Sequence, residues 1–221
     1  MPFRLPIFPL SVVLFPRNPL PLHIFEPRYR RMLADCLAED RRFGITPVPE
    51  NAEPPPAGAV GCVAEVRVNQ ELPDGRSNIV VVGGSRFTVS RLVEASEPYL
   101  VAMVQTFEDQ AGTEAAAEDI ETLRDLAIRY FSYIRELNDQ APDELVLPED
   151  GSRLSFHMAG SIECDLGIKQ RLLIERSTVR RIKSLTLLLP ILTSVVEGAI
   201  KVHRRAHGNG KGGTMPDVLT G

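Results

Sequence analysis

The side chains that most often bind metals are few in this chain, and they stand far apart. The 221 residues include four histidines: His23, His157, His203 and His207. Only His203 and His207 have the spacing to share a helical face, and no carboxylate ligand stands at a suitable distance along the sequence from them. His23 lies between apolar neighbours, where a hydrogen-bonded structural histidine is the commoner role. We therefore expect no metal site and no other cofactor.

The cysteines also lack the spacing of a functional site. Cys36, Cys62 and Cys164 are odd in number and contain no Cys-x-x-Cys pair. This pattern favours neither a disulfide framework nor a zinc site. We expect all three cysteines to be reduced and buried, in a packing role.

Two short motifs resemble catalytic sequences but lack a required residue. In GNGKGG, near the C-terminus, Lys211 is followed by Gly212, whereas a phosphate-binding loop needs Ser or Thr there. In Gly83-Gly84-Ser85, the glycine that a G-x-S-x-G nucleophile elbow requires after the serine is missing. The sequence therefore predicts no ATPase, no serine hydrolase and no catalytic residue.

Arginines gather on one early segment of the chain. They are Arg28, Arg30, Arg31, Arg41 and Arg42. Such a cluster could bind anions or acidic partners. Acidic residues stand among them: Glu26, Asp35, Glu39 and Asp40. The alternative is therefore a solvated face of ion pairs, and both interpretations stay open at this point.

The elements that must position these residues differ between the two halves of the chain. Of the 18 prolines, 14 lie in the first 98 residues. Within this half, proline-punctuated residues 5–15 predict an edge strand, because proline cannot donate to a sheet. Residues 29–37 carry apolar side chains at helical spacing after Pro27. Residues 60–69, 79–82, 86–89 and 99–107 predict short strands, with a hairpin at 73–75, a bend or bulge at 83–84 and an exposed loop over 47–58.

The second half has the spacing of helices. Residues 120–137 form an apolar stripe of more than four turns, and further helices are predicted over 152–163, 168–175 and 179–202, with a kink or a break near Leu189 caused by Pro190. Residues 185–196 are strongly apolar but too short to span a bilayer, so we interpret them as a buried helix. The predicted organisation is a β domain over 1–110, a helical bundle over 114–206 and a flexible tail over 207–221.

Composition excludes several classes of protein. With 43% hydrophobic residues, 24% charged residues and a formal net charge of −4, the chain is typical of soluble globular proteins. An acidic balance gives no general attraction to nucleic acid or an anionic membrane, and we expect neither as a partner. Pro2, Pro6 and Pro9 interrupt any leader-like apolar stretch, so we expect a cytoplasmic protein.

The order of several motifs identifies a family. LPIFPLSVVLFPRNPLPLHIFEPRYRRMLADCL begins at Leu5, and FGI, GCVAEV, LPDGR and GGSRF follow it up to Phe87. This series resembles the N-terminal substrate-binding domain of Lon proteases, over roughly residues 3 to 200. The resemblance implies an α+β fold: a mainly antiparallel, PUA-like β pseudobarrel with one inserted helix, then a C-terminal α-helical bundle.

The resemblance also implies a function. The sequence has no ATPase motif and no room for the Ser-Lys proteolytic domain, so it is similar to a stand-alone Lon N-domain protein. By analogy, it would bind polypeptide without catalysis, as an adaptor or quality-control factor for unfolded or specific client proteins, with a Lon-like protease as a further partner. The alternatives are a component of an ATP-dependent Lon-type peptidase and RNA binding through the barrel.

One surface has the composition of a protein contact. Phe25 and Tyr29 supply an apolar rim beside Arg28 and Arg31, and aromatic and arginine side chains are enriched at interfaces. With Glu26, these residues are the predicted polypeptide-binding site. The alternative is that Phe25 and Tyr29 only fasten the helix to the barrel. An exposed sheet edge could also add a strand from an extended peptide.

Overall fold

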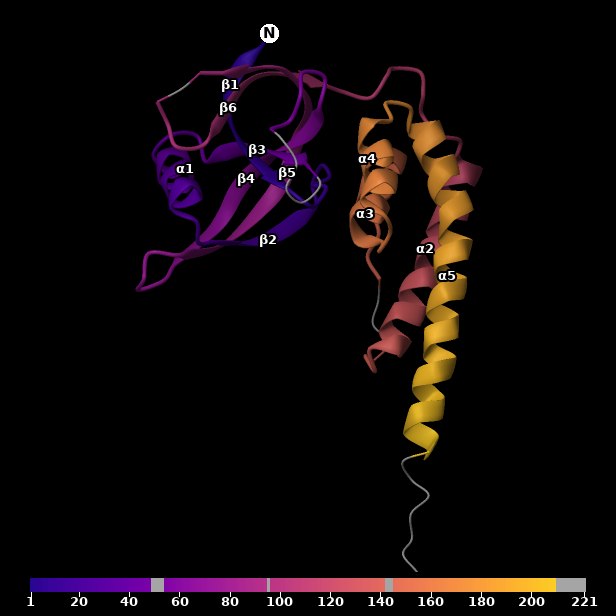
Figure 1. Cartoon of the computed structure of the whole chain (residues 1–221). Coiled ribbons are helices and arrows are strands. Elements are labelled where there is room, and N and C mark those ends of the chain that lie inside the picture. The colour runs from indigo at the N-terminus through magenta and orange to yellow at the C-terminus, as the bar shows by residue number, and fades with distance from the viewer. Residues whose placement is uncertain (49–53, 95, 142–144, 210–221) are drawn as a thin grey trace, which may run out of the picture.

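The computed structural model describes residues 1–48, 54–94, 96–141 and 145–209. Its elements follow in the order β1 (Phe3–Leu10), β2 (Pro19–Ile24), α1 (Pro27–Ala38), β3 (Arg42–Pro47), β4 (Val60–Glu71), β5 (Ser77–Val93), β6 (Leu100–Phe107), α2 (Ala117–Leu137), α3 (Gly151–Ser161), α4 (Leu166–Ile174) and α5 (Thr178–Asn209). A sheet part is followed by a helical part (Figure 1). The predicted α+β class, with one helix inserted among the strands, is confirmed.

The strands form one sheet that nearly closes into a ring. The strand order is β2-β5-β4-β3-β1-β6, and the long strand β5 also pairs with β6. Among the strand pairs of the described residues, β1–β3 is the parallel one. Buried apolar residues pack on both faces of the sheet: Ile7 and Phe87 belong to one cluster, and Phe43 belongs to another that also includes residues of α1. The mainly antiparallel barrel that the family resemblance implies is therefore present.

Strand β1 is not the edge strand that its prolines predicted. It lies between β3 and β6, and these neighbours use different halves of it. β6 pairs with residues 3–7, and β3 pairs with residues 7–10. Each half therefore has a sheet partner on one side only. Pro6 and Pro9 fall in different halves. The nitrogen of each proline, which carries no hydrogen, can therefore face the side where its half has no partner strand.

Strand β5 joins two predicted strands into one. It runs without interruption through Gly83 and Gly84, while its register with β4 shifts between the Cys62 and Ala64 pairs. The bulge predicted at the two glycines is present, but the strand does not end there. The segment before β2 crosses β5 at this point, where Pro16 pairs with Gly83.

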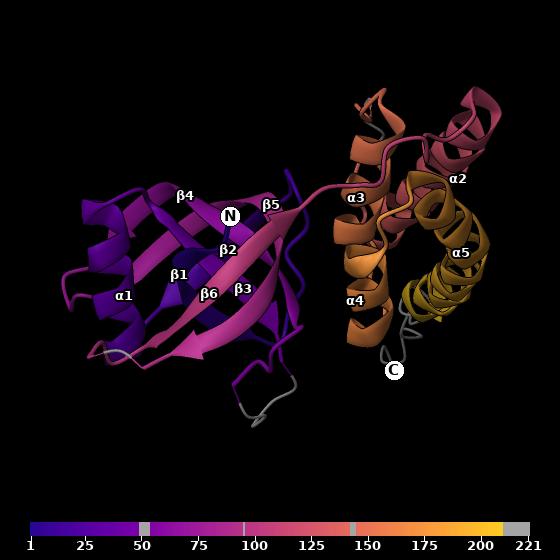
Figure 2. The same ribbon diagram turned by 90° about the horizontal axis from the view of Figure 1, so that it is seen from above.

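Helix α1 begins at Pro27, as its sequence predicted. Its apolar face, formed by Tyr29, Met32, Leu33 and Cys36, is buried in the barrel core. The helix lies on the side of the barrel that faces away from the helical part in both views (Figures 1 and 2). The predicted surface at Phe25–Arg31 is therefore at one end of the molecule.

Of the kink or break predicted near Leu189, the break is absent from helix α5. It continues through Pro190 to Asn209. Pro190 is exposed, so water can satisfy the carbonyl that loses its helical partner, while Leu185 and Leu189 are fully buried against the other helices. Packing on this inner face therefore outweighs the lost hydrogen bond.

The apolar stretch of α5 is also less buried than predicted. Leu187 and Ile191 are 75% and 63% exposed. Within the part of the chain that the structure describes, Thr178–Val202 is long and apolar enough to cross a membrane by length and composition, and only 22% of its most apolar window is buried. The core helix of a soluble protein can pass the same test. The prediction of a wholly buried helix is wrong because α5 packs along one face only.

The predicted C-terminal tail overlaps the end of α5. Residues 207–209 still belong to α5. The rest of the tail, 210–221, lies outside the described residues, as does part of the loop predicted over 47–58.

Candidate functional site

The structure separates the two aromatic residues of the predicted polypeptide-binding site. Tyr29 is 5% exposed, and its ring centroid lies 4.1 Å from that of Phe8 in the barrel core. Phe25 is 58% exposed and stacks on His23, with ring centroids 6.0 Å apart. Tyr29 therefore fastens α1 to the barrel, which was the alternative, while Phe25 is open to solvent.

The charged residues around Phe25 are already paired with one another. Arg28 forms an ion pair with Glu26 at 2.9 Å and lies over the Tyr29 ring, 4.5 Å from its centroid. Arg31 pairs with Asp35 at 3.0 Å. These contacts agree with a solvated face of ion pairs more than with an anion site.

The free edge of the sheet is poorly suited to adding a peptide strand. β2 is outermost in the strand order, and the Asn18 carbonyl accepts a hydrogen bond from Gly83 N at 3.0 Å. Successive residues of a strand direct their backbone groups to opposite sides, so those of Pro19 and Pro21 face away from β5. Both positions lack an N–H group, so this edge has few donors for a further strand.

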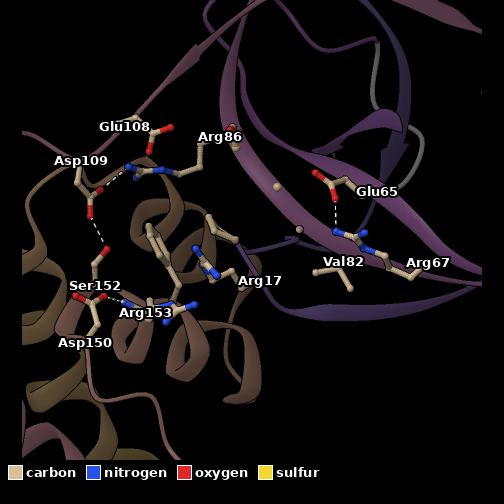
Figure 3. A pocket seen from close by; sticks show the side chains of 15 residues that line it. Arg17, Glu65, Arg67, Val82, Arg86, Glu108, Asp109, Asp150, Ser152 and Arg153 are labelled. Carbon is tan, nitrogen blue, oxygen red and sulfur yellow. Dashed lines mark hydrogen bonds and ion pairs between the residues drawn. The ribbon is translucent and has the colours of Figure 1, made fainter. Parts of the chain in front are cut away.

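A cavity of about 960 Å³ lies between the barrel and the helical part (Figure 3). One wall comes from β4, β5 and the segment before β2, and the other from α3 and the linker after β6. Its charged lining residues are Arg17, Glu65, Arg67, Arg86, Glu108, Asp109, Asp150 and Arg153. The cavity is polar, with positive and negative groups on both walls.

Asp109 holds the two walls together. Its carboxylate accepts hydrogen bonds from Arg181 at 2.7 and 3.1 Å, and it also pairs with Arg86. The hydroxyls of Ser152 and Thr178 each donate to the same carboxylate at 2.9 Å. The linker after β6 is thereby fixed to β5, α3 and α5 at one point.

The two arginines are themselves deeply buried. Arg86 and Arg181 are 3% and 0% exposed. Arg86 donates to the carbonyls of Leu173 and Glu175 at 2.9 and 2.8 Å, at the end of α4. Arg181 lies 3.8 Å from the centroid of the Phe156 ring. All three nitrogens of Arg181 and both terminal nitrogens of Arg86 form hydrogen bonds within the protein, so the cluster ties the parts together.

The surroundings of Asp109 also set its acidity. Burial acts to raise the pKa of this carboxyl, but the hydrogen bonds and charge of Arg181 and the charge of Arg86 outweigh burial and lower the pKa to about 2. The carboxylate therefore stays ionised at all ordinary pH values. Sequence reasoning missed this cluster; the only local signal was the Arg86 charge within the apolar run of β5.

A second groove, of about 470 Å³, lies between α4 and α5. Its walls are mainly apolar and include Ile168, Leu172, Leu187, Leu188 and Ile191. Polar groups at Arg171, Glu175 and Ser184 complete the lining. The exposed side chains of Leu187 and Ile191 form part of this apolar lining. Sequence reasoning missed it, because the apolar stretch of α5 was interpreted as buried.

The cysteines differ in their exposure. Cys36 and Cys62 are buried as predicted, whereas Cys164 is only half-buried, so its predicted burial is wrong. Burial raises the pKa of the Cys36 thiol to about 12, and burial also raises the pKa of Cys62. Among the residues that the structure describes, no group of three or more histidine, cysteine and acidic side chains could hold a metal ion.

We expect Cys164 to react first with a thiol reagent in the native protein. The other two thiols are reachable only when the fold opens, so their reaction with Ellman's reagent should be at least about tenfold slower. The absorbance of the released thiolate measures both phases. Cys164→Ser should remove the fast phase, and a fast phase that survives this change would contradict the structure.

The comparisons with known proteins agree with this architecture. Residues 4–190 match the family described as "ATP-dependent protease La (LON) substrate-binding domain". The chain belongs to the Lon substrate-binding domain family. The likeness predicted from the motif series is thus confirmed over most of the chain.

Relatives with known sequences are much longer than this chain. The Lon protease of Cytophaga hutchinsonii is 25% identical over 93% of this chain, which corresponds to 26% of that protein. The Lon protease of Xanthomonas oryzae pv. oryzae is 28% identical over 90% of this chain and 23% of its own length. The chain therefore spans about a quarter of these relatives.

Solved structures show the same fold. The crystal structure of a Lon N-terminal domain protein from Xanthomonas campestris has a TM-score of 0.64 at 22% identity, and the match covers 83% of this chain and 96% of that one. The N-terminal domain of a Mycobacterium avium complex Lon protease has a TM-score of 0.58 at 17% identity, covering 87% of this chain and 98% of that one. These two likenesses concern the fold alone.

Proposed function

We propose that the protein is a noncatalytic module that binds polypeptide, and that it acts as an adaptor or quality-control factor for unfolded or specific client proteins. The observation that carries this proposal is the apolar groove between α4 and α5, in a chain from a family of substrate-binding domains. In this proposal the module works in the cytoplasm, and a Lon-like protease receives the clients that it binds.

The groove suits an apolar segment of an unfolded chain. Leu187 and Ile191 are one helical turn apart on α5, and both expose most of their side chains. Covering apolar area of this kind gains roughly 25 cal/mol per Å². Arg171 and Ser184 at the rim can hydrogen-bond to the backbone of a bound segment, whatever its sequence. Such a site would favour unfolded over folded clients, because folded proteins hide their apolar residues.

The surface predicted from the sequence remains a second part of the proposal. Phe25 is its exposed apolar group, and Arg28 and Arg31 stand next to it on α1. It lies on the far side of the barrel from the helical part (Figure 2). A long client could contact both surfaces, whereas a short peptide could contact only one.

The test uses a labelled, permanently unfolded client, such as reduced and carboxymethylated α-lactalbumin, and fluorescence anisotropy. We expect Leu187→Asp with Ile191→Asp to weaken binding at least about tenfold, because a buried contact is replaced by two charges. The stability of the protein should not change, since both side chains are exposed.

Val202→Asp with Val195→Asp is the matched control, because both valines are exposed on the same helix and neither lines the groove. This control should bind within about twofold of wild type. Phe25→Asp shows separately whether the barrel surface contributes. A wild-type protein that does not bind the unfolded client would refute the proposed function, and equal loss in the control would refute the groove as its site.

A further inference from the structure

Two arginines of the cavity between the barrel and the helical part stand out by their lack of partners. Arg17 and Arg153 both line it, and both side chains are exposed (Figure 3). Within the described ranges, neither guanidinium has a hydrogen bond or an ion pair. The other two arginines of the lining are occupied, since Arg67 pairs with Glu65 and Arg86 pairs with Asp109.

Both free arginines start from fixed backbone. Arg17 N donates to the Gly83 carbonyl at 2.7 Å, and its φ of 64° turns the side chain out of the segment before β2. Arg153 is in the first turn of α3, where its N–H donates to the Asp150 carboxylate at 2.8 Å. The two guanidinium groups are therefore presented by rigid elements, and a ligand would not have to order a loop.

The walls of the cavity are also tied to each other. Asp109 joins them at one side, and Asn18 donates to the carbonyl of His157 in α3 at the other. Gln170 in α4 further donates to the Val60 carbonyl of β4 at 2.9 Å. The hollow is therefore preformed. Its volume of about 960 Å³ lies at the upper end of the range for small-ligand pockets, which leaves room for a peptide segment.

The two unpaired guanidinium groups select the ligand. Glu65 and Asp109 are neutralised by arginines, and Asp150 is engaged in capping α3. Among the described residues of the lining, the guanidinium groups of Arg17 and Arg153 are then left without an anion, while Asp150 and Glu108 keep their negative charges. Guanidinium groups favour carboxylates, which they bind with paired hydrogen bonds. Glu108 and its acidic neighbours disfavour a polyanion. The aromatic ring of the lining, Phe156, is only 7% exposed, so it offers little surface for stacking of a nucleic-acid base.

We propose that this cavity binds a peptide segment through an acidic side chain, with Arg17 and Arg153 as the carboxylate-binding residues. The inference deepens the proposed polypeptide-binding function and rests on it, but it concerns a different surface from the α4–α5 groove. It assigns the two surfaces different roles. The groove binds apolar residues of the client, and the cavity binds an isolated Asp or Glu that lies near those residues in the client sequence.

The experiment measures the anisotropy of three labelled Gly/Ser peptides at low ionic strength. The first is amidated at its C-terminus and carries a central Asp and Glu, the second has Asn and Gln in their place, and the third has a free C-terminal carboxylate and no acidic side chain. Wild type should bind the first at least about tenfold more tightly than the second. Comparison with the third distinguishes a side-chain carboxylate from a chain-terminal one.

Arg17→Glu with Arg153→Glu should remove the preference for the acidic peptide. Arg91→Glu with Arg180→Glu is the matched control, because it makes the same change in net charge at two exposed arginines outside the cavity. This control should keep the preference within about twofold. Equal binding of the first two peptides by wild type, or equal loss in both double variants, would overturn the inference.

The two proposals can fail separately. The Arg17→Glu, Arg153→Glu variant is also tested with the unfolded α-lactalbumin client, which probes the groove. Client binding without a preference for the acidic peptide would overturn only the cavity inference. A preference for the acidic peptide without client binding would support the cavity and refute the groove.

Discussion

Replacing Asp109 with alanine is expected to lower the free energy of unfolding by about 3–5 kcal/mol, because it leaves two buried arginines without their anion. Arg86 and Arg181 are 3% and 0% exposed, so the substitution leaves two cations that are poorly solvated. Ser152 and Thr178 lose an acceptor in the same step. Chemical denaturation, followed by circular dichroism, measures the change.

An exposed ion pair provides the control for this substitution. Asp74 pairs with Arg76 in the β4–β5 hairpin, where both side chains are about half exposed. Asp74→Ala should therefore change stability by less than about 1 kcal/mol. If the Asp109 and Asp74 variants had the same stability, the cluster would not hold the two parts of the molecule together.

The pH dependence of unfolding is a second readout of the Asp109 substitution. The folded pKa of Asp109 is about 2, below the unfolded value of about 3.9. Its contribution to stability is therefore present above pH 4 and is lost as the pH falls towards 2, when the unfolded state binds the proton more readily. In the alanine variant this part of the acid destabilisation should be missing.

Replacing Gly83 with alanine is expected to lower stability by about 3 kcal/mol or more, because a side chain there meets backbone that cannot move freely. A Cβ atom at Gly83 would lie 2.0 Å from the carbonyl oxygen of Phe15, where the segment before β2 crosses β5. The clash would push this segment away and break its hydrogen bonds to Gly83. Thermal and chemical denaturation both measure the loss.

The neighbouring glycine is a close control. A Cβ atom at Gly84 would first meet a carboxylate oxygen of Glu65, at 3.3 Å, and this end of a flexible side chain can shift. Gly84→Ala should therefore change stability by less than about 1 kcal/mol. Equal losses at the two glycines would show that the crossing at Phe15 does not set the requirement for glycine.

Most local structure of this protein could be predicted from residue spacing. Helix α1 begins at Pro27 and buries the apolar face that its sequence predicts, and the strands of the barrel lie close to their predicted places. The motif series from Leu5 to Phe87 also identified the family that the comparison confirms. These features depend on neighbours within a few residues, which the sequence displays directly.

The candidate site could be predicted only in part. Phe25 is exposed as a contact surface requires, but Tyr29 is buried because Phe8, from a strand earlier in the chain, covers its ring. The groove between α4 and α5 was missed because the apolar pattern of α5 does not say which of its faces will find a partner. Periodicity indicates that a helix has an apolar face, but only packing decides how much of it is covered.

The sequence by itself determined the elements, the family and the absence of the usual catalytic motifs. The tertiary structure decided which distant residues meet: Asp109 and Arg181 are 72 positions apart, and Asp109 and Arg86 are 23 apart. It also decided that Arg17 and Arg153, which are ordinary surface arginines in the sequence, line one cavity and have no ion-pair partner among the described residues. The physical reason is that local spacing fixes local hydrogen bonding, whereas the partners of a buried or unpaired charge depend on how the barrel and the helices pack together.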